Sequence, residues 1–227
     1  MKSLFAYKEL VVFDCETTGL DPINHQIIEL ACCRFLLDHD HYVLQEQYDR
    51  LVKAKDPLPS NIVDLTGITD EMLARNGLDE RIVATYFYDN FIANSSNKKL
   101  YIAYNAPFDI HFVGQLLRRN GLAFPNNSHF LDVLTIYKDR SSYPHKLVNA
   151  IALYKLDGTF INSHRAIDDC LACYEVLKTM AKNCDDLIRY VNLFGYNPKY
   201  PPVHRINGVR YKPQPYDSYV KLYEMIF

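Results

Sequence analysis

The chain has 227 residues and a mass of 26.4 kDa, enough for one α/β domain or one domain plus an extension. Apolar residues make up 48% and charged residues 23% of the sequence, which is typical of a soluble globular protein and argues against disorder. The 25 Lys and Arg nearly balance the 27 Asp and Glu, so bulk charge gives no attraction to nucleic acid or membranes. Any polyanion that this protein handles must therefore be held by a local site.

Three runs near the start of the chain have the apolar, β-rich character of strands. They span residues 10–13, 27–37 and 42–52, and together they predict a three-stranded meander. Residues 58–76 contain Pro, Thr and Gly between short helical pieces. Residues 80–93 have helical periodicity and predict a helix.

The middle of the chain alternates strands with helices. A fourth strand is expected at 100–104 and a fifth at 130–133. The helix between them is predicted over 107–120, because Pro107 suits the first helical position and Gly121 suits the position just past the end.

The last third of the chain begins with two further helices and then changes in composition. One helix is predicted over 146–155, and Ser163 can cap the next. The apolar stripe of that second helix consists of Ile167, Cys170, Leu171, Tyr174 and Leu177. Beyond it, Pro, Gly and Tyr become frequent, and we expect an irregular extension wrapped on the domain. The sequence thus predicts a domain at 1–184 and a packed C-terminal extension at 185–227.

The six cysteines do not have the spacing of a disulfide framework. Cys170 and Cys173 form a C-x-x-C pair within a helical pattern, but zinc would need a second pair that the sequence does not place nearby. Structural thiols in a reducing compartment are the expected reading. The N-terminus lacks a secretory pattern and no apolar run approaches a membrane span, so we expect a cytoplasmic protein without membrane contact.

Acidic residues stand directly after the first predicted strand. On a strand, Asp14 and Glu16 point to the same side and Cys15 to the other. Two carboxylates there repel each other unless a cation lies between them. The motif alone is also compatible with two exposed charges at a strand end.

Two more polar segments stand at the predicted starts of helices. Asn105 and Asp109 open the helix after the fourth strand, where a turn residue and a first-turn acid are common without any function. His164, Asp168 and Asp169 open a later helix, and each alone could be a surface or capping residue.

The three segments in this order resemble the DEDDh family of 3'-to-5' exonucleases, which includes the proofreading epsilon subunit of bacterial DNA polymerase III. The resemblance rests on FDCETTGL, DLTGITDEML, AYNAPFD, LDVLTIYK and HRAIDDCLACYEVL, and it covers roughly residues 8 to 182. It implies a ribonuclease H-like α/β fold, with a mixed five-stranded sheet flanked by helices.

The resemblance also implies the catalytic groups. Four carboxylates would bind two divalent metal ions, Mg²⁺ or Mn²⁺: Asp14, Glu16, Asp109 and Asp169. His164 would be the general base. The family's spacing of five residues from the histidine selects Asp169 rather than Asp168.

A nucleotide pocket follows from the same resemblance. Its expected members are Thr17, Thr18, Gly19, Leu20, Ile68, Asn105 and Phe108. Gly19 would let the backbone approach a ligand closely, Leu20 and Phe108 would touch a base, and Ile68 is a candidate wedge. For Phe108, plain core packing is an equally good reading. Tyr104 departs from the family pattern, where many relatives have histidine, and the extension after residue 184 lies outside it.

The expected function is metal-dependent release of nucleoside 5'-monophosphates from the 3' ends of nucleic acid, with DNA favoured over RNA. A DNA polymerase is a candidate partner, because the chain has no polymerase region of its own. RNA or short oligoribonucleotides remain an alternative substrate, since the choice depends on how the pocket treats a 2'-hydroxyl. A catalytically silent binding module and a structural subunit that docks through its tail are further alternatives.

Overall fold

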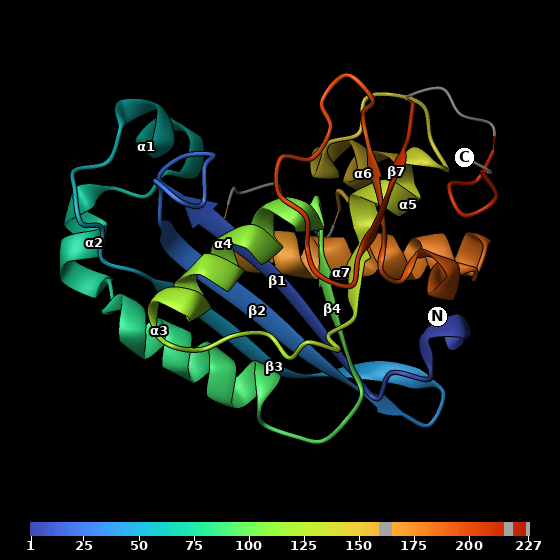
Figure 1. Cartoon of the computed structure of the whole chain (residues 1–227), viewed down its shortest axis with the longest axis horizontal. Coiled ribbons are helices and arrows are strands. Elements are labelled where there is room, and N and C mark those ends of the chain that lie inside the picture. The colour runs from blue at the N-terminus through green and yellow to red at the C-terminus, as the bar shows by residue number, and fades with distance from the viewer. Residues whose placement is uncertain (159–164, 216–219, 226–227) are drawn as a thin grey trace.

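The computed structural model describes residues 1–158, 165–215 and 220–225, and a mixed sheet forms its centre (Figure 1). The strand order in this sheet is β3-β2-β1-β4-β5. The strands are β1 (Glu9–Thr17), β2 (Ile27–Asp38), β3 (His41–Leu51), β4 (Lys99–Ala103) and β5 (Phe130–Asp132). The predicted five-stranded sheet is confirmed.

The sheet combines an antiparallel and a parallel half. β1, β2 and β3 form the predicted antiparallel meander, whereas β4 runs parallel to β1 and β5 parallel to β4. β1 continues past the apolar run at 10–13, because Asp14 still pairs with Ala31 and Glu16 with Glu29. Its polar end therefore belongs to the sheet and not to a loop.

Helices cover both faces of the sheet. They are α1 (Ser60–Thr66), α2 (Asp70–Asn76), α3 (Glu80–Phe87), α4 (Ala106–Arg119), α5 (Val133–Lys138), α6 (Leu147–Leu153) and α7 (Ala166–Asn183). α3 and α4 lie over one face and α7 over the other (Figure 1). The helix expected at 80–93 consists of α3 and a short π-helix, Tyr88–Ile92. The predicted architecture of a sheet flanked by helices is thus confirmed.

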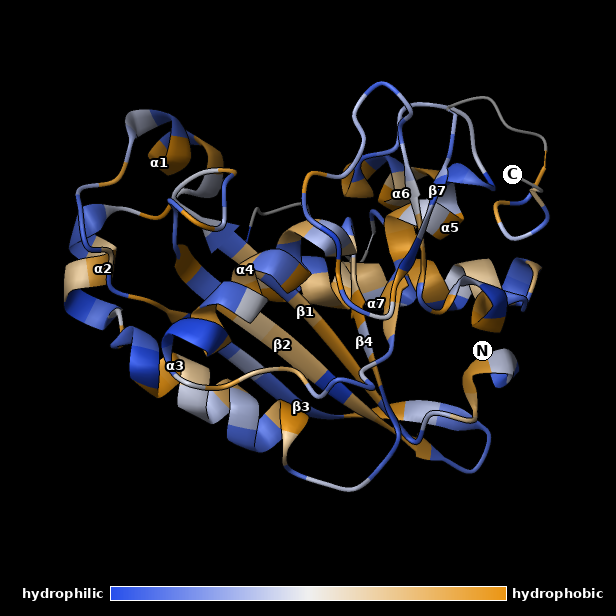
Figure 2. Cartoon of the chain, viewed as in Figure 1, coloured by the Kyte–Doolittle hydropathy of each residue, from blue (hydrophilic) through white to orange (hydrophobic). Residues whose placement is uncertain are grey.

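Alternate residues of β1 supply the two halves of the core. Leu10 and Val12 pack in the cluster that contains α7, while Val11 and Phe13 pack in the cluster that contains α3 and α4. Figure 2 shows the resulting hydrophobic colour along β1 and β2. The period of two in a strand produces this division.

One α-helix of the described residues, α5, was not expected from the sequence. Residues 130–133 predict only a strand, but β5 ends at Asp132 and α5 begins at Val133. The Asp132 carboxylate accepts hydrogen bonds from Leu134 N at 3.2 Å and Thr135 N at 3.1 Å. This N-cap ends the strand and starts the helix within one residue.

The segment after residue 184 is more regular than its composition predicts. It contains the short helix Leu187–Tyr190 and a parallel two-stranded ribbon, β6 (Leu193–Tyr196) and β7 (Arg210–Pro213). Phe194 is fully buried in the cluster with α3 and α4. The expectation of an irregular segment is therefore corrected, whereas the domain boundary near residue 184 stays a prediction.

All six cysteines are free thiols, and only Cys184 is exposed. Cys170 and Cys173 lie in the helical pattern expected of them, inside α7. Among the helices of the described residues, none is both long and apolar enough to cross a bilayer.

Candidate active site

The carboxyl end of β1 gathers the predicted acids. Asp14 and Glu16 continue the row of Leu10 and Val12, so their half-buried side chains lie on the face covered by α7. β4 pairs with β1 only as far as Val12, so the last residues of β1 have no partner strand on that side. The two carboxylates therefore lie where the sheet opens.

Asp169 completes a cluster with these two residues. It lies in the first turn of α7, and one carboxylate oxygen from each of Asp14, Glu16 and Asp169 is within 4.8 Å of the others. Asp168, its neighbour in the same turn, does not belong to this group. The geometry thus selects the same aspartate as the motif spacing.

Asp109 reaches the end of β1 from a helix that covers the other face. It lies in the first turn of α4, is 2% exposed, and accepts hydrogen bonds from the Cys15 backbone N–H at 3.1 Å and the Cys15 thiol at 3.4 Å. It is not within the 4.8 Å group, but its charge contributes to the raised pKa of Asp14. Asp109 therefore meets the unpaired edge of the strand end, close enough to Asp14 for their charges to interact.

The local electrostatics disfavour this concentration of negative charge. Burial, followed by the charges of Asp109, Asp169 and Glu16, raises the pKa of Asp14 well above its usual value. Burial and neighbouring acids raise the pKa of Glu16 to about 7, and burial raises the pKa of Asp109 to about 8.

A bound cation would oppose these pKa shifts, because it stabilises the charged form of each carboxylate. Among the residues that the structure describes, the donor set consists of carboxylate oxygens, which suit hard divalent ions such as Mg²⁺ or Mn²⁺. The residues present therefore fit a divalent metal centre.

A buried ion pair holds the start of α7, and the sequence analysis missed it. The Glu29 carboxylate is fully buried and accepts hydrogen bonds from Arg165 Nε at 2.8 Å and Nη2 at 2.5 Å. Its other oxygen accepts the Ala166 N–H at 3.1 Å, at the first residue of α7. The signal that could have revealed it is a lone glutamate inside the apolar run 27–37, because such a charge needs a partner.

The start of α4 is held in a similar way. Asn105 has a left-handed backbone conformation, with a φ of 66°, and turns β4 into the helix. The buried carboxylate of Asp132 accepts the Ala106 N–H at 3.0 Å, in addition to capping α5. Asp132 thereby fixes the helix that carries Asp109, although the sequence analysis assigned it no role.

The loop after β1 carries the predicted nucleotide-binding residues. Thr17 is buried and donates its hydroxyl hydrogen bond to the Gly19 carbonyl at 2.6 Å. A Cβ on Gly19 would come within 2.6 Å of the His25 ring, so the close approach that needs glycine here is to a side chain of the same loop. Leu20 projects into solvent with 84% of its surface exposed.

The remaining pocket residues do not all lie together. Phe108, in the first turn of α4, shares an apolar groove with Leu20, and its ring contacts Phe112 at 4.8 Å. Asn105 is exposed two residues before Pro107. Ile68, in contrast, is fully buried in a separate cluster beside Leu73, where packing leaves no surface for a base. The structure therefore does not bring Ile68 to the site.

His164 and Ser163 lie outside the described residues. The residue at the N-cap of α7 is Arg165, and its side chain makes no capping hydrogen bond. The expectation that Ser163 occupies the N-cap of this helix is therefore wrong, because α7 begins at Ala166, whereas the role of His164 stays a prediction from the sequence.

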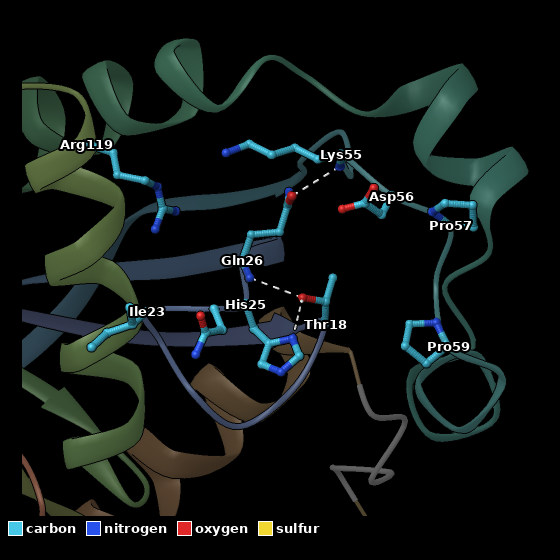
Figure 3. A pocket seen from close by; sticks show the side chains of 10 residues that line it. Thr18, Ile23, His25, Gln26, Lys55, Asp56, Pro57, Pro59 and Arg119 are labelled. Atoms are coloured by element: carbon cyan, nitrogen blue, oxygen red, sulfur yellow. Dashed lines mark hydrogen bonds between the residues drawn. The ribbon is translucent and has the colours of Figure 1, made fainter.

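A second hollow lies on the other side of the β1–β2 loop (Figure 3). Thr18 accepts the Gln26 N–H at 3.1 Å, and Gln26 in turn accepts the Lys55 N–H at 3.1 Å. Figure 3 shows Lys55 and Arg119 on the same side of this hollow. The Arg119 guanidinium already pairs with the Glu80 carboxylate at 2.8 Å, and Asp56 also lines the hollow, so the charges here are largely balanced.

The fold and the acidic cluster define a ribonuclease H-like protein with a nuclease-type carboxylate centre. Residues 11–177 match the RNase_T family model, which is described as exonuclease. The chain belongs to this exonuclease family, a group of nucleases that hydrolyse phosphodiester bonds, and the DEDDh resemblance is confirmed.

Its relatives include much longer polymerases. The chain is 32% identical over 182 residues to the PolC-type DNA polymerase III of Halalkalibacterium halodurans, covering 78% of this chain and 12% of that protein. It is 31% identical over 186 residues to the PolC-type enzyme of Bacillus cereus, with 79% and 12% covered. The chain thus spans about an eighth of these relatives.

Solved structures of exonuclease I share the fold. The zinc-bound complex of the E. coli enzyme with single-stranded DNA has a TM-score of 0.67 and 20% identity, covering 81% of this chain and 42% of that one. Exonuclease I of Methylocaldum szegediense has a TM-score of 0.64 and 21% identity, with 80% and 42% covered.

Proposed function

We propose that this chain is a 3'-to-5' exonuclease that uses two divalent metal ions, Mg²⁺ or Mn²⁺, to release nucleoside 5'-monophosphates from DNA 3' ends in proofreading or repair. One observation carries the proposal: the carboxylates of Asp14, Glu16 and Asp169 converge within 4.8 Å at the end of β1. Asp109 approaches the same strand end from α4.

These four acids would hold the ions. Such a pair of cations, when bound, lowers the pKa of a water molecule and neutralises the charge on the phosphate. Asp109 is oriented by the Cys15 N–H, and Asp169 by the anchored start of α7, so both are presented on rigid elements. His164 precedes Arg165 in sequence, and in the proposal its neutral imidazole takes the proton of the attacking water.

The loop after β1 and the start of α4 would hold the terminal nucleotide. Leu20 and Phe108 offer apolar surface to its base, and Asn105 is exposed at the N-cap of the same helix as Phe108. Thr17, Thr18 and Gly19 would place backbone and hydroxyl groups near the sugar and phosphate. Stacking tolerates all bases, so little base specificity is expected.

DNA is proposed over RNA because the relatives are named DNA polymerases and a neighbouring structure holds single-stranded DNA. A DNA polymerase is the proposed partner on the same ground. Free thiols throughout the chain support a reducing, cytoplasmic location. An RNA-degrading enzyme and a silent binding module are the competing outcomes of the test.

The test compares 5'-labelled single strands of DNA and RNA with one sequence, in Mg²⁺, Mn²⁺ or EDTA. A metal-dependent ladder that shortens from the 3' end, faster on DNA, is expected. Asp14→Asn should abolish it, whereas Asp168→Asn, a matched control in the same helical turn as Asp169, should retain it. Faster shortening of RNA would identify RNA as the substrate in place of DNA. Binding of the strand by the parent without cleavage would identify a catalytically silent binding module.

The role of His164 needs a separate variant. His164→Ala should lower kcat by about 10²–10⁴-fold, the usual contribution of a general base, while Mn²⁺ affinity stays within about twofold. An unchanged kcat in saturating Mg²⁺ would remove His164 as the base.

A further inference from the structure

Part of the C-terminal segment lies on the groove that Leu20 and Phe108 share. Pro202, Val203 and His204 line this groove together with those two residues. Figure 1 shows the same segment, in orange-red, passing the end of α4 where the chain enters from β4. The apolar surface assigned to the terminal base therefore has a wall that comes from outside the motifs.

The groove is small and mostly apolar. Its volume is about 210 Å³, below the roughly 300–1,000 Å³ of pockets for larger ligands, so a small planar group fits it better than a long chain. Val203 is 89% exposed and Leu20 is 84% exposed, although both are large apolar side chains. Neighbouring apolar side chains left open in this way indicate a surface that a ligand covers.

The segment is held in place by contacts that His204 and the residues after it make. Ile206 and Val209 pack against the core cluster beneath α4, and the Ile206 N–H donates to the Tyr211 hydroxyl at 3.3 Å. The His204 ring meets the His111 ring of α4 edge to face at 5.7 Å. Val203 is therefore presented by a supported piece of backbone.

The groove is built on two of the same elements as the carboxylate centre, although none of the four acids lines it. Phe108 directly precedes Asp109, and Leu20 follows β1 by three residues, so both groove walls extend from elements that carry the acids. A phosphodiester held at the carboxylates would place its terminal base within reach of these walls. An aromatic ring and apolar side chains suit the face of a base.

From this geometry we infer that Pro202, Val203 and His204 form part of the substrate site and cover the unpaired base of the 3'-terminal nucleotide. This inference rests on the proposed function. In this arrangement, the segment of Pro202, Val203 and His204 positions the substrate. The enzyme should then favour a 3' end that is frayed or single-stranded, because a paired base could not enter between this segment and Phe108.

The test compares two variants, one with a new negative charge in the groove and one with the same charge outside it. Val203→Asp should raise KM for single-stranded DNA by about tenfold and leave kcat within about twofold, the loss expected when one stacking surface is spoiled. Tyr200→Asp is the matched control, since Tyr200 is 76% exposed in the same connection and does not line the groove. It should leave both constants unchanged, and both variants should keep the melting temperature of the parent.

A strand that ends in an abasic 3' nucleotide tests for the base itself. On that strand Val203→Asp and the parent should have equal KM. The inference is overturned if Val203→Asp has no effect on normal DNA, if Tyr200→Asp has the same effect, or if the abasic strand shows the same loss.

Failure of the proposed function would look different, because the parent would release no nucleotide from any strand. Anisotropy of the labelled strand then replaces the kinetics. Weaker binding by Val203→Asp alone supports the inference, and equal binding by all three proteins overturns it.

Discussion

Replacing Arg165 with alanine should destabilise the protein and weaken its metal binding together. Glu29 is fully buried, and its carboxylate accepts two hydrogen bonds from the Arg165 guanidinium and one from the Ala166 N–H. Across the β1–β2 ladder, Glu29 faces Glu16, and Arg165 also lies 3.6 Å from the Asp49 carboxylate. Without Arg165, a buried carboxylate remains among other acids.

The magnitude follows from burial. Removing one partner of a buried ion pair costs about 3–5 kcal/mol, because the other charge stays buried. The Arg165 side chain is 39% exposed, so water would replace part of the lost solvation, and we expect about 2–3 kcal/mol. For a chain of this size that corresponds to a fall in melting temperature of roughly 5–10 °C.

The metal affinity should fall for a separate reason. Glu29 also accepts the Ala166 N–H, so the pair fixes the first turn of α7, which carries Asp169. Loss of a group that orients a metal ligand typically costs about 10–100-fold in affinity. Calorimetric titration with Mn²⁺ and thermal unfolding in EDTA measure the two effects independently.

Three further variants make the reasoning refutable. Arg165→Lys keeps the charge but loses the two-pronged contact, so it should recover part of both losses. Glu29→Gln with Arg165→Met should recover most of the stability, because no charge is left buried and unpaired. Arg118→Ala, an exposed arginine on α4, should change neither quantity. If the free energy of unfolding of Arg165→Ala lies within about 0.5 kcal/mol of the parent value, the ion pair of Arg165 with Glu29 does not hold α7 as described.

Other consequences concern the carboxylates and the loop. Asp14→Asn should raise the melting temperature of the metal-free protein, because it removes one of several carboxylates that repel each other. The same variant should no longer be stabilised by Mg²⁺. A melting temperature in EDTA below that of the parent would contradict this reasoning. In EDTA, stability should fall as pH rises from about 5 to 8. The folded protein retains protons on Glu16 up to a pKa of about 7 and on Asp109 up to about 8, whereas the unfolded chain releases them near 4. Saturating Mg²⁺ should flatten that dependence, and parallel pH series of thermal unfolding with and without Mg²⁺ would reveal it. Gly19→Ala should displace the His25 ring and raise KM several-fold, and Gly19→Ala with His25→Ala should relieve the clash; equal kinetics of Gly19→Ala and the parent would show that the loop adapts freely.

Local patterns were sufficient for the framework of the site. Period-two alternation placed Asp14 and Glu16 on one side of β1, and Pro107 with Gly121 bounded α4 to within a residue. Both patterns depend only on residues that are close in sequence, so the sequence alone was enough to predict these features. The motif spacing chose Asp169, and the geometry of α7 agrees because one aspartate of the first turn faces β1 and the other does not.

Long-range contacts were out of reach of the same patterns. Glu29 and Arg165 are 136 residues apart, and nothing local pairs them. Ile68 stands in a family motif, yet its side chain is fully buried, because a motif does not show which side of a turn packs inward. The tail has the composition of a loop, but Phe194 anchors β6 in the core and allows a parallel ribbon to form.

The anchoring contacts explain how a cluster that opposes its own assembly is kept in place. The acids at the end of β1 raise each other's pKa, so without a cation they act against the folded state. Each is attached to an element that is fixed elsewhere: Asp14 and Glu16 by the β1–β2 ladder, Asp169 by the Glu29 pair, and Asp109 by the Cys15 N–H. The rest of the fold therefore provides the stability that holds the four acids together. A cation that binds there relieves their repulsion, and this relief adds to the free energy of metal binding. A variant that weakens an anchor should consequently lose metal affinity before it loses its fold.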